Sequence, residues 1–193
     1  MSTIAIVHTK GGVGKTTSAL YLAAAAVSAG RTVVVLDADP QGSATDWAEA
    51  ATAAGAPLPY LVRPVSTRRI GADADAEITI IDTPPGTAKA ISTAIDAADL
   101  VVIPTGVSPV DVRRVWPTLE VTAHRPTAVL LTSVDLRTSL AHEVRALLDD
   151  EGVPVVGTPI LRRESIRRTY GAPPTRLHGY DDVLTELLEA IDE

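Results

Sequence analysis

The stretch from residue 9 to residue 17 constrains the fold more than any other feature of the chain. It reads Thr-Lys-Gly-Gly-Val-Gly-Lys-Thr-Thr, after the apolar run Ile4–Val7 and before an alanine-rich helical pattern from Thr16 to Ala29. Glycine lets the main chain turn tightly and approach another group closely. A short buried strand, a glycine turn and a helix in this order are typical of an α/β protein.

A glycine-rich loop that opens a helix can bind phosphate, because several backbone N–H groups and the positive helix end point at the same place. We expect Lys15 to reach the β and γ phosphates of ATP and the Thr16 hydroxyl to bind Mg²⁺. The ordinary pattern has glycine where Thr9 stands, and Lys10 adds a second lysine. The predicted ATP-binding residues are Lys10, Gly11, Gly12, Val13, Gly14, Lys15, Thr16 and Thr17.

Three aspartates follow predicted strands. Asp37 and Asp39 come after residues 32–36, and Asp82 comes after residues 78–81. Strand carboxyl ends form the ligand crevice of an open α/β sheet, so these carboxylates should face the phosphates. We expect Asp37, Asp82 and Thr16 to hold Mg²⁺. A helix cap or a turn is the alternative role for each aspartate.

Asp39 lies slightly beyond the predicted metal site and could orient or deprotonate an attacking water. Thr83–Gly86 follows Asp82 as a stiff turn, and its Gly86 N–H could sense the γ-phosphate. A rigid connection is the simpler interpretation of this turn. Lys10, Lys15 and Asp39 are therefore the candidate catalytic residues.

Apolar runs alternate with helical patterns along the whole chain. Strands are predicted at 4–7, 32–36, 78–81, 100–103, 128–131 and 153–156, with a short one within 55–76. Helices are predicted at 16–29, 43–54, 87–97, 109–123, 139–151 and 180–191. This alternation predicts an α/β fold of the P-loop NTPase type, with a mainly parallel twisted sheet of about 7–8 strands and helices on both faces. We expect a single domain over residues 1–193.

Composition and charge exclude several classes of protein. There is no cysteine, which excludes disulfides, cysteine-ligated zinc and iron–sulfur clusters. The net charge of −7 disfavours nucleic-acid binding over the whole surface but allows a local basic patch. No signal peptide or spanning segment is evident, so we expect a cytoplasmic protein. The four histidines, His8 among them, show no metal-ligand spacing and are interpreted as ordinary polar residues. Trp47 and Trp116 are interpreted as packing residues.

Four arginines gather near the end of the chain, with Glu164 among them. On a helix, Arg163 and Arg167 would stack one turn apart, with Arg168 beside them. Such a cluster suits contacts with DNA phosphates without reading bases. A solvated helix face, or pairing with the acidic C-terminal helix, is the alternative. The candidate DNA-binding residues are Arg162, Arg163, Arg167 and Arg168.

Three strings resemble the ParA/MinD family of P-loop ATPases, which has a deviant Walker A loop. They are residues 10–17, Leu-Asp-Ala-Asp-Pro-Gln-Gly-Ser at 36–43 and Ile-Asp-Thr-Pro-Pro-Gly at 81–86. Small ParA-type partition proteins are the most similar members. The resemblance implies a slow ATPase that forms a homodimer around two ATP molecules, with Lys10 crossing to the partner's nucleotide and Asp39 serving hydrolysis.

The resemblance also implies partners. They are a ParB-like centromere-binding protein that stimulates hydrolysis and non-specific DNA bound by the ATP state, which would place the protein on the nucleoid. Nine residues precede Lys10, so we expect no N-terminal DNA-binding domain. The resulting prediction is plasmid or chromosome segregation.

Two other functions stay open. A MinD-like positioning ATPase would need a basic amphipathic C-terminal helix, whereas residues 181–193 are acidic. We therefore expect no membrane partner, and we expect Leu184, Leu187, Leu188 and Ile191 to pack on the domain. A biosynthetic enzyme of the dethiobiotin synthetase type would need a small-molecule pocket, for which the sequence shows no signature.

Overall fold

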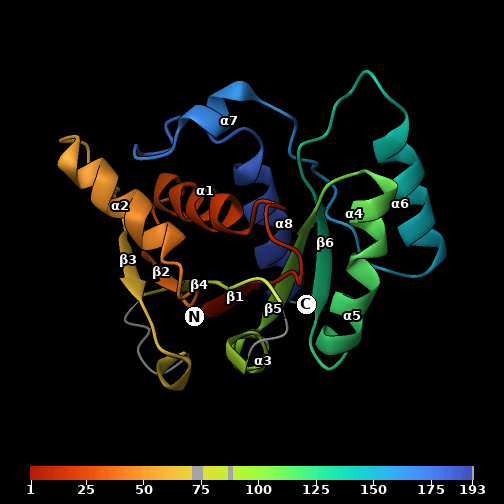
Figure 1. Cartoon of the computed structure of the whole chain (residues 1–193), viewed down its shortest axis with the longest axis horizontal. Helices are drawn as coiled ribbons and strands as arrows, with labels where there is room; N and C mark the ends of the chain where they lie inside the picture. Colours follow the sequence, from red (N-terminus) through yellow and green to blue (C-terminus); the bar gives the residue numbers. More distant parts are fainter. Residues whose placement is uncertain (71–75, 87–88, 193) are drawn as a thin grey trace.

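The core of the protein is a six-stranded sheet in which every named strand pair is parallel. The computed structural model describes residues 1–70, 76–86 and 89–192. The strand order is β3-β2-β4-β1-β5-β6 (Figure 1). The strands are β1 (Ser2–Ile6), β2 (Val33–Asp37), β3 (Leu61–Pro64), β4 (Ile78–Asp82), β5 (Leu100–Thr105) and β6 (Thr127–Leu131).

Helices cover both faces of the sheet, as the alternating pattern predicts. They are α1 (Lys15–Ser28), α2 (Ser43–Ala53), α3 (Lys89–Ala97), α4 (Pro109–Arg113), α5 (Val115–Thr122), α6 (Leu140–Asp150), α7 (Glu164–Arg168) and α8 (Tyr180–Asp192), with a 3₁₀ turn at Thr67–Arg69. One apolar core joins the sheet to α1, α2 and α8, and a second joins it to α3, α5 and α6. Figure 1 shows α1 and α3 on opposite sides of the sheet.

The β-branched composition of the central strands explains their burial. β2 and β4 are buried at every residue, which requires apolar side chains on both faces of the sheet. β3 is partly exposed at the edge and ends at Pro64, a residue that an edge strand tolerates because it cannot donate to a ladder. The apolar runs at 78–81 and 100–103 are confirmed as strands.

Two predictions about the elements need correction. The sheet has six strands among the described residues, not seven or eight, because residues 153–156 make only an isolated bridge between Val155 and Val129. The single helix predicted at 109–123 is two helices, α4 and α5. Pro117 explains the break, since its ring clashes with the carbonyl four residues earlier, that of Arg113. Residues 87 and 88, the predicted start of α3, lie outside the described residues.

The connections after β1 and β4 leave the sheet in opposite directions. β1 leads through α1 to β2, and β4 leads through α3 to β5, on the other face. β1 and β4 are neighbours, paired from Ser2 with Ile78 to Ile6 with Asp82. A topological switch of this kind opens a crevice at the strand carboxyl ends, where ligands bind in open α/β sheets.

Candidate nucleotide-binding site

The loop between β1 and α1 has the geometry that its glycines permit. Gly12 and Gly14 adopt φ of 76° and 97°, in the left-handed region that other residues rarely occupy. Gly14 directly precedes α1, so the first N–H groups of the helix face the crevice. The Thr132 hydroxyl, at the end of β6, donates to the Val13 carbonyl at 3.1 Å and fixes the loop from one side. The predicted cradle is therefore present as a strand–loop–helix unit.

The two lysines of the loop are connected. Lys15 is buried, with 7% of the residue exposed, and its ammonium donates to the Lys10 carbonyl at 3.2 Å. Burial lowers the pKa of Lys15, while Asp82 and Asp39 raise it. A buried ammonium with one carbonyl partner has donors left for anions, which is the role predicted for Lys15.

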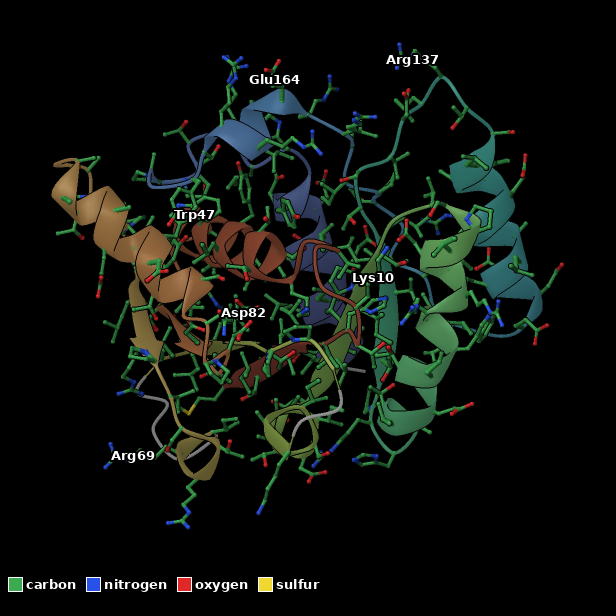
Figure 2. The ribbon with its side chains drawn as sticks, in the orientation of Figure 1. Lys10, Trp47, Arg69, Asp82, Arg137 and Glu164 are labelled. Atoms are coloured by element: carbon green, nitrogen blue, oxygen red, sulfur yellow. The ribbon has the colours of Figure 1, made fainter. Side chains whose placement is uncertain are left out.

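Lys10 points away from the loop toward α4, as Figure 2 shows. Its ammonium forms an ion pair with Asp111 at 2.5 Å. Its backbone N–H donates to Nδ1 of His8 at 2.9 Å, and the His8 ring is completely buried. His8 is thus not the ordinary polar residue that the sequence suggested, because it supports the loop. One sequence signal points to the local role of Asp111, because Ser108 and Asp111 have the spacing of a capping box at a helix start.

Asp82 is the most unusual carboxylate of the site. It is fully buried at the end of β4, and neither of its oxygens has a hydrogen-bond partner among the described residues. Burial raises its pKa to about 7, with Thr16 acting in the opposite direction and Asp37 adding to the increase. An unpartnered buried carboxylate is costly unless a cation or a water compensates it.

Asp37 lies beside Asp82 in the register of the two strands and has partners of its own. One oxygen accepts from the backbone N–H and the hydroxyl of Thr45, at 2.9 and 2.7 Å, and the other accepts from the Asp39 N–H at 3.2 Å. The helix-cap alternative therefore describes part of what Asp37 does. Its role as a magnesium ligand remains a prediction.

Asp39 borders the phosphate loop and also forms a turn. Its carboxylate accepts from the Gln41 N–H at 2.9 Å, and its carbonyl accepts from the Gly42 N–H at 2.9 Å. Asp39 and Gln41 line a hollow of about 500 Å³ with Lys15 and most glycines of the loop. This hollow is large enough for a triphosphate and an attacking water, so both roles predicted for Asp39 are compatible with its position.

The residues present fit a magnesium ion held together with a nucleotide. Asp82 supplies an uncompensated carboxylate, and Thr16 lies close enough to influence its pKa. No group of three His, Cys, Asp or Glu side chains is arranged to hold a metal in the described part of the chain. Mg²⁺ usually keeps several waters and takes one or two carboxylates plus phosphate oxygens, which matches this incomplete protein shell.

The loop after β4 contacts the phosphate loop directly. The Gly86 N–H donates to the Thr9 carbonyl at 2.8 Å, and the Thr83 hydroxyl donates to the Ile6 carbonyl at 2.8 Å. The N–H that could sense a γ-phosphate is therefore engaged within the protein. To sense the γ-phosphate, the Gly86 N–H would have to leave the Thr9 carbonyl and donate to a phosphate oxygen.

A second hollow, of about 340 Å³, adjoins the loop on the side of α7. Its walls include Gly12, Thr17, Ser133 and Tyr170. Tyr170 and Trp47 lie with their rings 5.5 Å apart, and the Trp47 indole donates to the Ala172 carbonyl. This hollow is suitable for a nucleoside next to the phosphates. Sequence reasoning did not find it, because its residues come from five separate segments of the chain.

The arginine cluster forms one wall of a third hollow, of about 630 Å³. Five arginines and two carboxylates line it: Arg137, Arg162, Arg163, Arg167 and Arg168, with Asp135 and Glu164. Figure 2 labels Arg137 and Glu164 at the same end of the molecule. The prediction that Arg163 stacks with Arg167 on a helix is wrong, since Arg163 precedes α7 with extended backbone.

The arginines differ in whether they line the 340 Å³ hollow next to the phosphate loop. Arg162, Arg163 and Arg167 also line the 340 Å³ hollow, whereas Arg137 and Arg168 line only the outer one. Arg168 pairs with Glu164 at 2.6 Å, and Arg137 pairs with Asp135 at 2.6 Å. Within the described residues, no ion pair joins the four predicted arginines to α8.

The apolar face of α8 packs on the domain, as the sequence predicted. Val183, Leu184 and Leu187 are buried, and Leu188 and Ile191 pack partly against the same core. The Tyr180 hydroxyl and Ser18 of α1 lie within hydrogen-bonding distance at 3.1 Å. In the described residues, no helix has the length and apolar character needed to cross a membrane.

The parallel sheet, the strand–loop–helix cradle and the buried carboxylate together define a P-loop nucleotide-binding protein. The family described as CobQ/CobB/MinD/ParA nucleotide binding domain matches residues 4–172. The chain belongs to this family, and is an ATPase of the ParA/MinD type.

Two relatives support the family assignment, and a solved structure shares the fold. Maintenance of carboxysome distribution protein A of Gloeobacter kilaueensis is 41% identical over 165 residues, 78% of this chain and 72% of that protein. The chromosome-partitioning ATPase Soj of Thermus thermophilus is 31% identical, over 75% of this chain and 74% of its own. The fold resembles cobyrinic acid a,c-diamide synthase from Mycobacterium smegmatis with bound ADP and magnesium, at a TM-score of 0.78, 22% identity and coverage of 100% and 96%.

Proposed function

We propose that this protein is a positioning or partition ATPase, in which bound Mg²⁺-ATP drives dimerisation and hydrolysis reverses it. The proposal depends on one observation: the phosphate loop has two lysines, of which one is buried and the other is partly exposed. Lys15 is buried in the phosphate loop, whereas the Lys10 side chain is 37% exposed and pairs with Asp111 at the start of α4. The proposal assigns Lys15 to the nucleotide of its own protomer and the partly exposed Lys10 to the nucleotide of a partner.

A lysine supplied by the partner would act on charge that develops during phosphoryl transfer. Such transfer requires mainly positioning and electrostatic stabilisation, and a cation supplied in trans can raise the rate by roughly 10³–10⁵. Asp39 would orient the water, and Asp82 with Thr16 would hold the Mg²⁺, which neutralises phosphate charge. Asp37 would complete the metal site through water.

The dimerisation step is tested with Lys10→Ala against Lys89→Ala, a change of the same type at an exposed lysine on α3. We expect Lys10→Ala to bind ATP normally but to stay monomeric in light scattering with Mg²⁺-ATP, while Lys89→Ala dimerises. An ATP-dependent dimer of Lys10→Ala would contradict the proposal.

DNA binding is the second part of the proposed cycle. Five arginines against two carboxylates give the outer hollow a local positive charge in a protein of net charge −7. A dimer would present two such surfaces, and contacts with phosphates alone would be independent of sequence. The ATP state would then associate with the nucleoid, and a ParB-like partner on the cargo would stimulate hydrolysis.

Arg137 and Arg168 provide the sharpest test of DNA binding, because they do not line the 340 Å³ hollow that is suitable for a nucleoside. Changing both to Glu should abolish retention on DNA with ATP at moderate salt and leave ATP affinity unchanged. Arg68 and Arg69 serve as the control, since they are exposed on the 3₁₀ turn at the opposite end of the view in Figure 2. If both double variants bind DNA equally well, the arginine surface has no such role.

Two kinds of cargo are consistent with this cycle. Plasmid or chromosome segregation is the first, supported by the relation to Soj. Positioning of a large protein assembly inside the cell is the second, supported by 41% identity to a carboxysome distribution protein. Affinity capture with the ATP-bound dimer of a hydrolysis-deficient variant distinguishes the two cargoes. A centromere-binding protein should be recovered in the first case, and a component of the protein assembly in the second.

A biosynthetic ATP-dependent enzyme is the alternative from another class, since the fold is shared with a cobyrinic acid a,c-diamide synthase. Steady-state phosphate release separates the two. A partition ATPase should be slow alone and faster with DNA and a partner. Phosphate release that depends on a small molecule and is unaffected by DNA would favour the enzyme.

A further inference from the structure

We propose that Asp111 is a positioning residue that holds Lys10 within its own protomer until the ATP dimer forms. This inference rests on the proposed function, in which Lys10 acts on the partner's nucleotide. Asp111 lies 101 residues from Lys10 in the sequence, near the start of α4, and accepts from the Lys10 ammonium at 2.5 Å.

The carboxylate of Asp111 is fixed on its own side of the pair. The Ser108 hydroxyl donates to its second oxygen at 2.6 Å, and the Asp111 N–H donates to the Ser108 carbonyl at 2.9 Å. Burial raises the pKa of Asp111, but hydrogen bonds from Lys10 and Ser108 outweigh burial and leave it lowered. One oxygen therefore belongs to the helix cap and the other to Lys10.

The space around this carboxylate is shaped for it. A Cβ placed on Gly106 would lie 2.5 Å from the second oxygen of Asp111, so any side chain at that position would force the carboxylate to move. The Asp111 side chain is 19% exposed, so it is not a freely solvated surface group. Gly106 and Ser108 thus keep the carboxylate at one place beside the phosphate loop.

The main chain of Lys10 is fixed at both of its polar groups. Its N–H donates to His8 at 2.9 Å, and its carbonyl accepts from Lys15 at 3.2 Å. With the backbone held, the position of the ammonium depends on its anionic partner. In the monomer that partner is Asp111, and in the proposed dimer it is a phosphate of the other protomer.

Lys10 cannot serve both anions, so dimerisation must break the pair with Asp111. Partly exposed ion pairs contribute about 0.2–1 kcal/mol, which corresponds to a factor of roughly 1.4–5 in an equilibrium. Releasing Lys10 should therefore favour the dimer by a modest, measurable amount. The acidic residue would set how much ATP is needed before protomers associate.

Asp111→Asn tests this directly, with Asp96→Asn as the control. Asp96 forms an exposed pair with His124, so its replacement makes the same change of charge away from the loop. We expect Asp111→Asn to reach half-maximal dimerisation at an ATP concentration about 1.4- to 5-fold lower than wild type. Asp96→Asn should match wild type. Ser108→Ala, which keeps the carboxylate but frees it, should shift the midpoint less and in the same direction.

A second readout examines the pair without any dimer. The chain has three lysines, and amine acetylation followed by mass spectrometry compares Lys10 with the exposed Lys89. In the nucleotide-free monomer, Asp111→Asn should acetylate Lys10 faster relative to Lys89. An unchanged labelling ratio, or a dimerisation midpoint that is equal to or higher than wild type, would overturn the inference. The two tests are separate, because the labelling ratio is measured in the monomer and does not depend on dimerisation. An ATP-dependent dimer of Lys10→Ala would refute the proposed function, not the pairing of Lys10 with Asp111.

Discussion

Asp82 and Asp37 lie side by side at the ends of β4 and β2, but they have opposite hydrogen-bonding environments. Asp37 accepts three hydrogen bonds from Thr45 and Asp39, whereas Asp82 has no partner among the described residues. The two adjacent carboxylates thus have different roles. Asp37 organises the start of α2, and Asp82 remains available for a cation that arrives with the nucleotide.

Replacing Asp82 by Asn should stabilise the nucleotide-free protein and weaken its response to Mg²⁺-ATP. Burial raises the pKa of this carboxylate to about 7, so at pH 8 the group is ionised and its buried charge destabilises the folded state. Replacing this buried, unpartnered charge by a neutral amide should increase the free energy of unfolding by about 1–3 kcal/mol. Urea denaturation at pH 8, with and without Mg²⁺-ATP, measures both effects. If the variant is destabilised and still gains the full ATP-induced stabilisation, Asp82 is not the metal-facing group.

Asp39→Ala should separate ATP binding from hydrolysis. The carboxylate borders the phosphate hollow, and among the described residues it accepts only from the Gln41 N–H, so its loss should leave the cradle intact. We expect a lasting ATP-dependent dimer with phosphate release lowered at least tenfold, since general base catalysis contributes about 10²–10⁴. Single-turnover phosphate release is the measurement, and Asp46→Ala on α2 is a control. Normal release by Asp39→Ala would assign the water to another residue.

His8 predicts a specific pH dependence of stability. Burial, followed by the charges of Lys15 and Lys10, lowers its pKa to about 4, compared with 6.5 in the unfolded chain. The unfolded state therefore takes up a proton first as the pH falls below 6.5, and this contribution to stability is lost progressively toward pH 4. His8→Asn cannot titrate, so the difference in free energy of unfolding between wild type and His8→Asn should decrease from pH 7 to pH 5.

The same position can be tested at constant pH. Asn retains an acceptor for the Lys10 N–H, whereas His8→Leu removes it and should cost about 1 kcal/mol more at pH 7. Chemical denaturation of the three proteins gives these values. A difference between wild type and His8→Asn that is independent of pH would mean that His8 is accessible to protons in the folded state.

The sequence was most informative where local chemistry determines local structure. The glycine loop and the strand-end aspartates require particular residue types at particular spacings, so their placement could be predicted before the fold was known. Periodicity also located α6 and α8 within one or two residues. It failed at Pro117, whose effect on a helix depends on where that helix begins, and at residues 153–156, whose pairing depends on distant β6.

The contacts that control Lys10 could not be predicted in the same way. Asp111 and His8 act through tertiary contacts. The spacing of Ser108 and Asp111 indicates a helix start but not a contact with Lys10, and His8 has no distinctive residue pattern around it. Tyr170 meets Trp47 across 123 residues of sequence, which no local rule anticipates. Helix and strand signals define which elements form, whereas the packing of loops between them decides which side chains share a site.

The binding of ATP in the presence of Mg²⁺ tests the central claim most directly. Isothermal titration of wild type and Lys15→Ala compares a cradle with and without its buried ammonium, which contacts the Lys10 carbonyl before nucleotide arrives. Wild type should bind one ATP per chain, and Lys15→Ala should lose at least tenfold in affinity, since charge-assisted hydrogen bonds contribute about 1.5–3 kcal/mol. No measurable binding by folded wild-type protein, or equal affinity of the two proteins, would contradict the account.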